Sequence, residues 1–394
     1  MKRVHKLADC HFNTVVGLRR YFHQYPELSG KEENTAKKIC QTLDLLQIPY
    51  RRNIAGHGVI AQLQGKGHAH RVIALRADMD ALPVQEIANV PYASTIPGVM
   101  HACGHDAHIA SLLGTLMILN DLKEDFGGIL QAIFQPSEEE YPGGAKLMIE
   151  EGVLHSPPTD AIFAQHVTPE IETGCIGIRE GAFMASTDEI HIRIIGKGGH
   201  AALPNEYINP VEVGIDLLKK VKENIESQNQ TNVTTVLAFG KFVADGLTNL
   251  IPDSAIIAGT LRTFDETWRK EAHNIILKTA EKIGKEQNAT CHVEIKKGYP
   301  VLVNDVEITE RVRKYATELL GKERVLSLPQ RTTADDFAYF LQQKPGMLYR
   351  LGTLNEKKGN IYRLHSNQFD IDENALLVGM KLMSWITLNE LQLR

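Results

Sequence analysis

The sequence has no long apolar segment and no long run of one charge. No stretch approaches the roughly 18 consecutive apolar residues expected of a transmembrane helix. The formal net charge is −5, and neither sign forms a long run. Nothing therefore points to a membrane anchor or a nucleic-acid surface, and we expect a small-molecule partner.

Cysteine is scarce as well. The chain contains five cysteines, an odd number, and they do not follow the spacing of a disulfide framework. The N-terminal residues begin with basic side chains, but no apolar segment of the kind found in secretory signals follows them. We therefore predict a protein of a reducing compartment, the cytoplasm.

Two widespread catalytic motifs are also missing. The sequence has no Gly-x-Ser-x-Gly motif, which excludes the ordinary serine hydrolase route. The glycine-rich residues 196–199 lack the Lys-Ser/Thr continuation of a phosphate-binding loop, so nucleotide binding is not expected.

Length and residue pattern indicate two domains. The 394 residues exceed the roughly 250–300 at which a single hydrophobic core stops growing. Residues 186–297 predict the order β-α-β-β-α-β, which is the ferredoxin-like arrangement. We interpret them as an α+β insert between residues 1–185 and 298–394, which together form a larger α/β domain with an open, mostly parallel sheet flanked by helices.

The densest chemistry lies at residues 100–108, which contain three histidines, a cysteine and an aspartate. The apolar residues that follow recur at three- and four-residue intervals, so the cluster should occupy the loop and first turn of an amphipathic helix. Imidazole and thiolate ligands suit zinc best, although manganese, cobalt or nickel could occupy a mixed site. The alternative is a buried cysteine beside helix-facing histidines.

Polar side chains follow three apolar runs, at residues 72–75, 129–134 and 161–164, which predict buried strands. In an open α/β sheet, sites form outside the carboxyl ends of the strands, so we expect these polar side chains to share one crevice. They are Asp78, Glu138, Glu139 and His166.

The adjacent carboxylates of Glu138 and Glu139 cannot point the same way in a loop. One can therefore ligate a metal while the other faces the substrate as a general base. The alternative is a solvated acidic turn. Asp78 could orient a ligating imidazole, or it could cap a turn or pair with Arg76. His101 stays open as a ligand or a supporting residue, and His166 could be an ordinary core histidine.

Seven segments give the chain a family resemblance that extends over nearly its whole length. They are HQYPELS at 23–29, RADMDALP at 76–83, MHACGHD at 100–106, FQPSEE at 134–139, GKGGHAALP at 196–204, GTLRTF at 259–264 and DFAY at 336–339. The chain resembles the hippurate hydrolase and aminoacylase-like amidohydrolases, a branch of the dinuclear-metal aminoacylase and carboxypeptidase family.

The resemblance implies a site with two divalent metal ions. Its ligands would be Cys103 as a bridging thiolate, His105, Glu139, His166 and His365. Glu138 would be the general base, and His200 would stabilise the oxyanion, either within its own subunit or in the partner subunit. Asn249 and Arg262 would hold the substrate's carboxylate. The smaller domain of such proteins usually mediates dimerisation and closes over the site, which implies a homodimer or higher homo-oligomer.

Two positions depart from the family pattern. Asp335 replaces a common glutamate, and Gln165 stands where leucine is frequent. We expect both near the wall of the substrate pocket, where they would affect substrate preference.

Our hypothesis from the sequence is metal-dependent hydrolysis of N-acyl amino acids, of the N-acetyl or hippurate type, to a carboxylate and a free amino acid. A dipeptidase or carboxypeptidase with the same metal centre is the first alternative. A metal-dependent binding protein without catalysis is the second, and it would predict loss of Glu138 or of a ligand.

Overall fold

The computed structural model describes residues 1–230, 232–358 and 362–393. The chain divides into two compact units. The first comprises Met1–Gly181, Val303–Pro329 and Asp336–Arg394, and the second comprises Ala182–Leu302 and Gln330–Asp335. No helix within the described residues combines the length and the apolar character needed to cross a membrane.

An eight-stranded sheet forms the centre of the first unit, with the strand order β1-β2-β4-β3-β5-β16-β6-β15. The central neighbours β4, β3, β5 and β16 run parallel, and antiparallel pairs flank them. The strands are β1 (Tyr50–Ile54), β2 (Gly58–Gln64), β3 (Gly67–Asp78), β4 (Gly127–Gln135), β5 (Ala161–Glu172), β6 (Ile176–Ile178), β15 (Val325–Ser327) and β16 (Gly346–Leu354).

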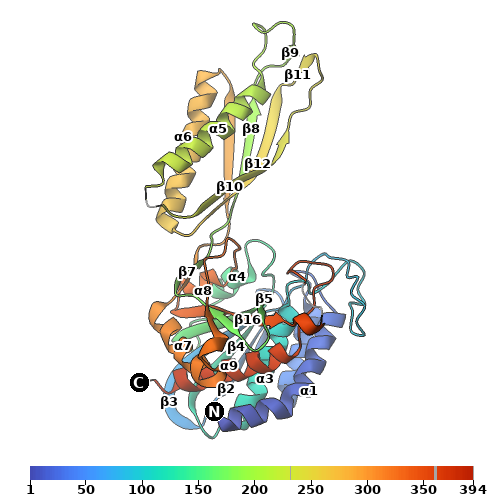
Figure 1. Ribbon diagram of the computed structural model, residues 1–394, viewed down its shortest axis with the longest axis vertical. Helices are drawn as coiled ribbons and strands as arrows, with labels where there is room; N and C mark the ends of the chain where they lie inside the picture. The colour runs from blue at the N-terminus through green and yellow to red at the C-terminus, as the bar shows by residue number, and fades with distance from the viewer. Residues whose placement is uncertain (231, 359–361, 394) are drawn as a thin grey trace. The chain divides into compact units, whose positions relative to one another are not determined.

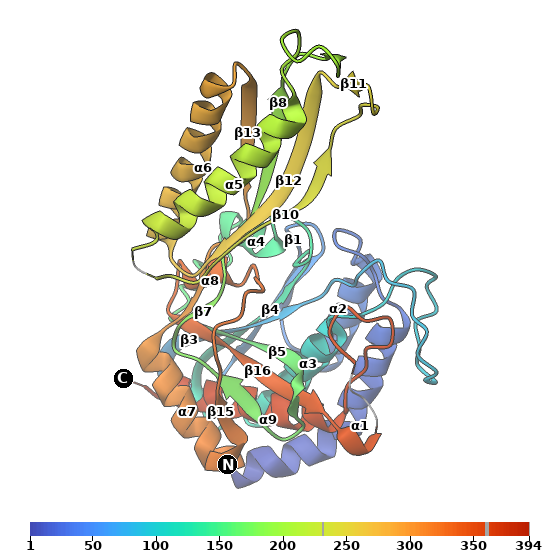
Figure 2. The same ribbon diagram turned by 45° about the horizontal axis from the view of Figure 1, so that its top comes forward.

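Helices cover this sheet, and α3 is the most deeply enclosed of them. Every residue of α3 from the first, His105, to Leu119 is buried, and α1 and α9 pack against it. Figure 2 shows α1 and α9 side by side near the N-terminus. The helices are α1 (Lys2–Gln24), α2 (Glu33–Leu45), α3 (His105–Asp121), α4 (Gly144–Glu150), α7 (Val306–Leu320), α8 (Ala338–Leu341) and α9 (Asn374–Leu391), with 3₁₀ turns η1 (Lys322–Arg324) and η2 (Glu356–Lys358). The prediction that the α3 helix is amphipathic is wrong, because a helix that is apolar on every side packs inside the protein.

The second unit has the ferredoxin-like order expected of the insert. Its antiparallel sheet has the strand order β10-β12-β8-β13, and Figure 1 shows α5 and α6 side by side along it. Both helices start at side-chain caps, Asn209 and Asp265. The elements are β8 (Asp188–Ile195), α5 (Pro210–Gln228), β10 (Thr235–Val243), β12 (Ser254–Thr263), α6 (Glu266–Glu286) and β13 (Thr290–Lys297), with a small ribbon of β9 (Gly199–His200) and β11 (Leu250–Ile251).

Two further short strands, β7 (Gly181–Met184) and β14 (Leu302–Asn304), lie where the chain passes from one unit to the other. The predicted fold class is confirmed: an α/β unit with a sheet that is parallel at its centre, and an inserted α+β unit of ferredoxin-like topology.

The register of β5 determines where His166 lies. Strand β3 pairs with β5 only from Ala161 to Ala164, whereas β16 pairs with β5 as far as Glu172. The prediction that this strand ends at Ala164 is therefore wrong, and His166 lies inside β5. It nevertheless follows the last residue paired with β3, so its side chain lies at the end of the parallel pairing.

Candidate metal centre

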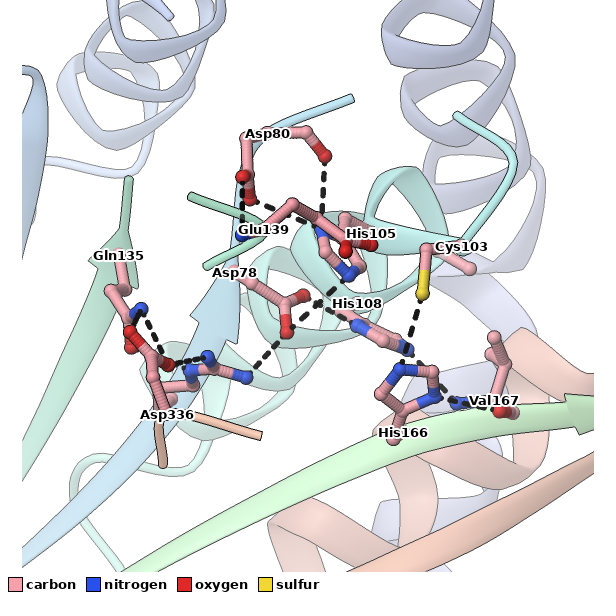
Figure 3. A network of polar contacts seen from close by, with 12 residues as sticks. Asp78, Asp80, Cys103, His105, His108, Gln135, Glu139, His166, Val167 and Asp336 are labelled. Atoms are coloured by element: carbon pink, nitrogen blue, oxygen red, sulfur yellow. Dashed lines mark hydrogen bonds and ion pairs between the residues drawn. The ribbon is translucent and has the colours of Figure 1, made fainter. Parts of the chain in front are cut away.

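The first group of candidate ligands forms where α3 begins. Cys103, His105 and His166 each offer a ligand atom, and these atoms lie within 4.8 Å of one another. The Sγ atom of Cys103 is 3.5 Å from Nε2 of His166, and a dashed line in Figure 3 marks this contact. Gly104, between the cysteine and the first histidine, has φ +85, and an added Cβ would come within 2.4 Å of Val167. Only glycine therefore fits this turn.

A second group shares the same sulfur atom. Cys103, Glu139 and His365 offer ligand atoms within 4.8 Å of one another, and Nε2 of His365 lies 3.4 Å from Oε1 of Glu139. The backbone N–H of His365 donates to the carbonyl of Ala102 at 2.8 Å. This bond ties the His365 loop to the residue just before the shared cysteine.

Two of these side chains have a buried ligand atom that is available to bind a metal ion. Within the described residues, the buried atoms Nε2 of His105 and Oε1 of Glu139 make no hydrogen bond. Buried polar atoms without partners are uncommon unless an ion or water satisfies them. The two groups offer nitrogen and sulfur in one case and nitrogen, oxygen and sulfur in the other, which suits zinc and related divalent ions.

Neighbouring charges and burial shift the pKa values of three candidate ligands. Burial and the Glu139 carboxylate raise the pKa of Cys103 above its usual value. Contacts with Cys103 and Glu139 raise the pKa of His365 to about 10. Burial lowers the pKa of His105, but the charges of Asp78 and Cys103 outweigh it and hold that pKa well above the usual value. Cation binding would require these groups to lose their protons.

Asp80, which the sequence interpretation did not select, orients His105. Its carbonyl oxygen lies 2.9 Å and its Oδ1 3.2 Å from Nδ1 of the ring, which directs Nε2 toward the other ligands. Oδ2 of Asp80 accepts the backbone N–H of Glu139 at 2.9 Å. One carboxylate thus contacts two of the candidate ligands (Figure 3).

Asp78 pairs with Arg76, which was one of the alternatives for it, and contacts an imidazole outside the proposed ligand set. Its closest imidazole is that of His108, whose Nδ1 lies 2.5 Å from Oδ1, and its other oxygen pairs with Arg76. Nε2 of His108 accepts the backbone N–H of Val167 at 2.9 Å. Asp78 therefore supports β5 next to His166, and its Oδ2 lies 3.8 Å from His105.

Glu138 lies beside the ligand groups. It is 7% exposed, and a carboxylate oxygen of Glu138 lies within 4.8 Å of ligand atoms of both His105 and Glu139. His101, by contrast, belongs to none of the ligand groups among the described residues. Burial lowers the pKa of His101 to about 3, which keeps its ring neutral.

Three predicted site residues lie in the second unit. His200 is in β9, opposite Leu250 of β11, and the carbonyl of Asn249 accepts the backbone N–H of Ala201 at 3.1 Å. His200 and Asn249 are therefore neighbours in one exposed ribbon. Arg262 lies on β12, half buried, and donates to the carbonyl of Thr332 at 3.2 Å.

Gln165 does not line a pocket, contrary to the sequence-based expectation. It is 1% exposed, and its Oε1 accepts the hydroxyl of Tyr349 at 3.0 Å. Its amide also lies 3.0 Å from the position that a Cβ on Gly379 of α9 would take. Because β5 alternates its side chains, Gln165 faces the helices while His166 faces the site.

Comparison with known proteins agrees with this geometry. Residues 74–388 match the profile of peptidase family M20/M25/M40. The chain belongs to this family. The resemblance inferred from the seven sequence segments is thereby confirmed.

The relatives of this M20-family chain include hydrolases of more than one kind. Thermostable carboxypeptidase 2 of Saccharolobus solfataricus is 37% identical over 93% of this chain and 92% of its own length. N-acetyl-L-cysteine deacetylase of Bacillus subtilis is 36% identical over 92% of this chain and 85% of its own. A solved Bacillus subtilis structure, described as a dinuclear metal binding peptidase from the M20 family, is 32% identical with a TM-score of 0.86, covering 98% of this chain and 99% of that one.

Proposed function

We propose that this protein is a metal-dependent amidohydrolase that cleaves the amide bond of N-acyl amino acids, of the N-acetyl or hippurate type. The observation that carries the proposal is the position of Glu138, buried beside two ligand groups that share Cys103. The relatives support it, because one is named for the removal of an acetyl group from N-acetyl-L-cysteine.

Cys103, His105 and His166 would hold one divalent ion, and Cys103, Glu139 and His365 a second. Bound divalent ions of this kind lower the pKa of water and polarise a carbonyl group. Zinc or manganese is the proposed metal, with cobalt or nickel as alternatives. A solved relative is described as binding a dinuclear metal, which supports the count of two.

The chain's own groups have separate roles in the proposal. Glu138 takes a proton from the attacking water and returns it to the leaving amine nitrogen. His200 stabilises the oxyanion, and Asn249 and Arg262 bind the substrate's carboxylate. Asp80 and Asp78 act through His105 and His108 and do not touch the substrate.

A substitution of the base tests the proposal. Glu138→Gln keeps the size and shape of the side chain but removes its ability to accept a proton. We expect it to retain two metal ions per subunit, measured by elemental analysis, and to lose about 10²–10⁴-fold in kcat. Hydrolysis of N-acyl amino acids at the parental rate by this variant would refute the role of Glu138.

Carboxypeptidase or dipeptidase activity at the same centre is the second candidate. It is favoured by the 37% identity to a thermostable carboxypeptidase. N-acetyl amino acids, hippurate and dipeptides should be assayed side by side, using metal-stripped protein reconstituted separately with zinc, manganese, cobalt or nickel. Higher kcat/KM for acyl amino acids supports the amidohydrolase, and higher kcat/KM for dipeptides supports the alternative. A binding protein without catalysis would hydrolyse neither substrate class. The sequence contains Glu138 and all five proposed ligands, which argues against this alternative.

We further propose a cytoplasmic homodimer or higher homo-oligomer. The described residues include all five cysteines, and none of them forms a disulfide, which suits a reducing compartment. Light scattering on the purified protein would give the oligomeric state, and a monomer at all concentrations would contradict it.

A further inference from the structure

Glu32 is a buried carboxylate to which the proposed reaction gives no role. It is 0% exposed and directly precedes α2. Its Oε1 accepts the backbone N–H of Ser137 at 2.7 Å and lies 3.5 Å from the Ser137 hydroxyl. Its Oε2 is buried and makes no hydrogen bond within the described part of the chain. Leaving a carboxylate oxygen in that state costs stability, so packing alone does not account for Glu32.

Capping of α2 does not account for Glu32 either. Glu32 is the N-cap residue, but its side chain makes no capping hydrogen bond. The first turn is capped by Glu27 instead, whose Oε2 accepts the N–H of Thr35 at 2.8 Å and whose Oε1 accepts that of Asn34 at 3.2 Å. The carboxylate of Glu32 therefore points away from its own helix, toward the loop after β4.

The residue that Glu32 contacts has an unusual backbone. Ser137 has φ +52, a left-handed conformation that a residue other than glycine adopts only where its surroundings hold it there. The carboxylate of Glu32 accepts the N–H of Ser137, and the carbonyl of Ser137 accepts the N–H of Gly144 at 2.9 Å. The conformation of Ser137 sets the direction in which the chain continues into Glu138.

The backbone on the other side of Glu138 is also bound by a carboxylate. The N–H of Glu139 donates to Asp80 at 2.9 Å. Two carboxylates thus bind the N–H groups of the residues before and after Glu138. Asp80 also contacts His105, so its loss would disturb a proposed ligand, whereas Glu32 hydrogen-bonds to this loop, in the described residues, only through Ser137.

We propose that Glu32 is a positioning residue for Glu138: by binding Ser137 it holds the left-handed turn that places the Glu138 carboxylate beside the ligand groups. The inference rests on the proposed function, in which Glu138 is the general base. Glutamine has the same length and keeps an oxygen that can accept the N–H of Ser137, so it is a fair substitute for this side chain.

The test compares substitutions of Glu32 in the parental protein and in Glu138→Gln. We expect Glu32→Ala to lower kcat by about 10- to 100-fold, because a misplacement of about 1 Å can cost 10²-fold. KM should stay within about twofold, and the protein should keep two metal ions per subunit. Glu32→Gln keeps a carbonyl oxygen for Ser137 and should recover kcat to within about fivefold of the parent. In Glu138→Gln, Glu32→Ala should have little further effect, because the base it positions is already absent.

Two further variants control for folding. Glu27→Ala removes the cap of α2 in the same segment, so it should lower the melting temperature and leave kcat unchanged. Glu32→Asp keeps a carboxylate but shortens it by one methylene, so the contact with Ser137 is lost. If Glu32→Ala does not fold, Glu32→Asp replaces it, and parental kcat in folded Glu32→Asp would overturn the inference.

The outcomes separate this inference from the proposed function. An equal fall in kcat in both backgrounds, or a fall that follows metal loss, would overturn the positioning role while leaving Glu138 as the base. Parental kcat in Glu138→Gln would instead overturn the proposed function, and the role of Glu32 with it.

Discussion

Asp80 joins two proposed ligands through one side chain. It is fully buried, and besides His105 and the backbone of Glu139 it accepts the hydroxyl of Ser29 at 2.6 Å. Burial raises the pKa of Asp80, but its hydrogen bonds with His105 and Ser29 outweigh burial and lower that pKa below its usual value, so the group is anionic. An anionic acceptor at Nδ1 keeps the proton on that nitrogen and leaves Nε2 free to ligate.

Asp80→Asn should therefore weaken metal binding. The amide is a poorer acceptor for Nδ1 than the carboxylate, and loss of such a supporting partner typically costs about 10- to 100-fold in metal affinity. Competition with a chromogenic chelator would measure the dissociation constant of the metal.

The matched variant is Asp78→Asn. It removes one of the two carboxylates that pair with Arg76, whose side chain is 1% exposed, whereas Asp336, 2.8 Å from the same guanidinium, remains. We expect a loss of about 1.5–3 kcal/mol in the free energy of unfolding, with a smaller effect on metal affinity. Urea unfolding would measure it. Weaker metal binding in a stable Asp78→Asn than in Asp80→Asn would reverse the roles assigned here.

The sequence cannot distinguish these two aspartates. Both follow the same apolar run, two residues apart, and alternation in a strand would place them on one face. The choice depends on where α3 brings His105 and His108, which are three residues apart and so lie on one side of that helix. Only the packing of α3 against β3 decides which carboxylate meets which ring.

Secondary-structure elements bring the remaining ligands together. β4 ends at Gln135, directly after its apolar run, and β3 ends at Asp78, three residues after its own, which places Asp78 and the Glu138–Glu139 pair at one edge of the sheet. β5 is longer than its apolar run, because pairing with β16 continues to Glu172. That pairing is between residues about 180 positions apart, so a local pattern could not have predicted it. His365, in a polar loop, was identified by family resemblance and not by its local sequence.

Helix α6 holds the ends of two strands in the second unit through a buried ion cluster. The buried guanidinium of Arg269 binds Asp188 at the start of β8 and the carbonyl of Gly298 after β13. His273, one turn further along α6, has Nε2 2.6 Å from Asp188. Glu266 pairs with the same arginine at 3.0 Å.

This cluster predicts an acid-sensitive contribution to stability. Burial raises the pKa of Asp188, but His273 and Arg269 outweigh it and lower that pKa to about 2, below its ordinary 3.8. A lowered folded-state pKa stabilises the protein above the unfolded-state value, and that stabilisation is lost as pH falls from about 4 to about 2. Asp188→Asn should lower the melting temperature at pH 7 and should reduce its pH dependence in that range.

Melting curves between pH 2 and pH 7 would check this prediction. The control is Glu281→Gln on the same helix, because Glu281 pairs with Lys285 on the exposed surface and such pairs contribute little. An unchanged acid dependence in Asp188→Asn would contradict the role of the cluster.

At the scale of the whole molecule, each unit has its own hydrophobic core, and all five proposed ligands belong to the first. The order of elements predicted both architectures because the periods of the two units differ. The first has continuous apolar strands, and the second has alternating ones such as β8. The length of β5 and the full burial of α3 arise from contacts across the first unit and were not predictable locally.

Metal removal should therefore destabilise the first unit selectively. An ion that binds only the folded state at about 1,000 times its dissociation constant adds about 4 kcal/mol. For a unit of this size that corresponds to a fall of about 10 °C on chelation. Differential scanning calorimetry with and without chelator would show it. Equal shifts of both transitions would contradict the assignment of all ligands to the first unit.

The most direct test of the account is anomalous diffraction from crystals of the zinc-loaded protein, recorded on both sides of the zinc absorption edge. We predict two anomalous peaks, each about 2.3 Å from the sulfur of Cys103, one also bonded to His105 and His166 and the other to Glu139 and His365. Peaks that do not share Cys103, or a single peak away from these side chains, would contradict it.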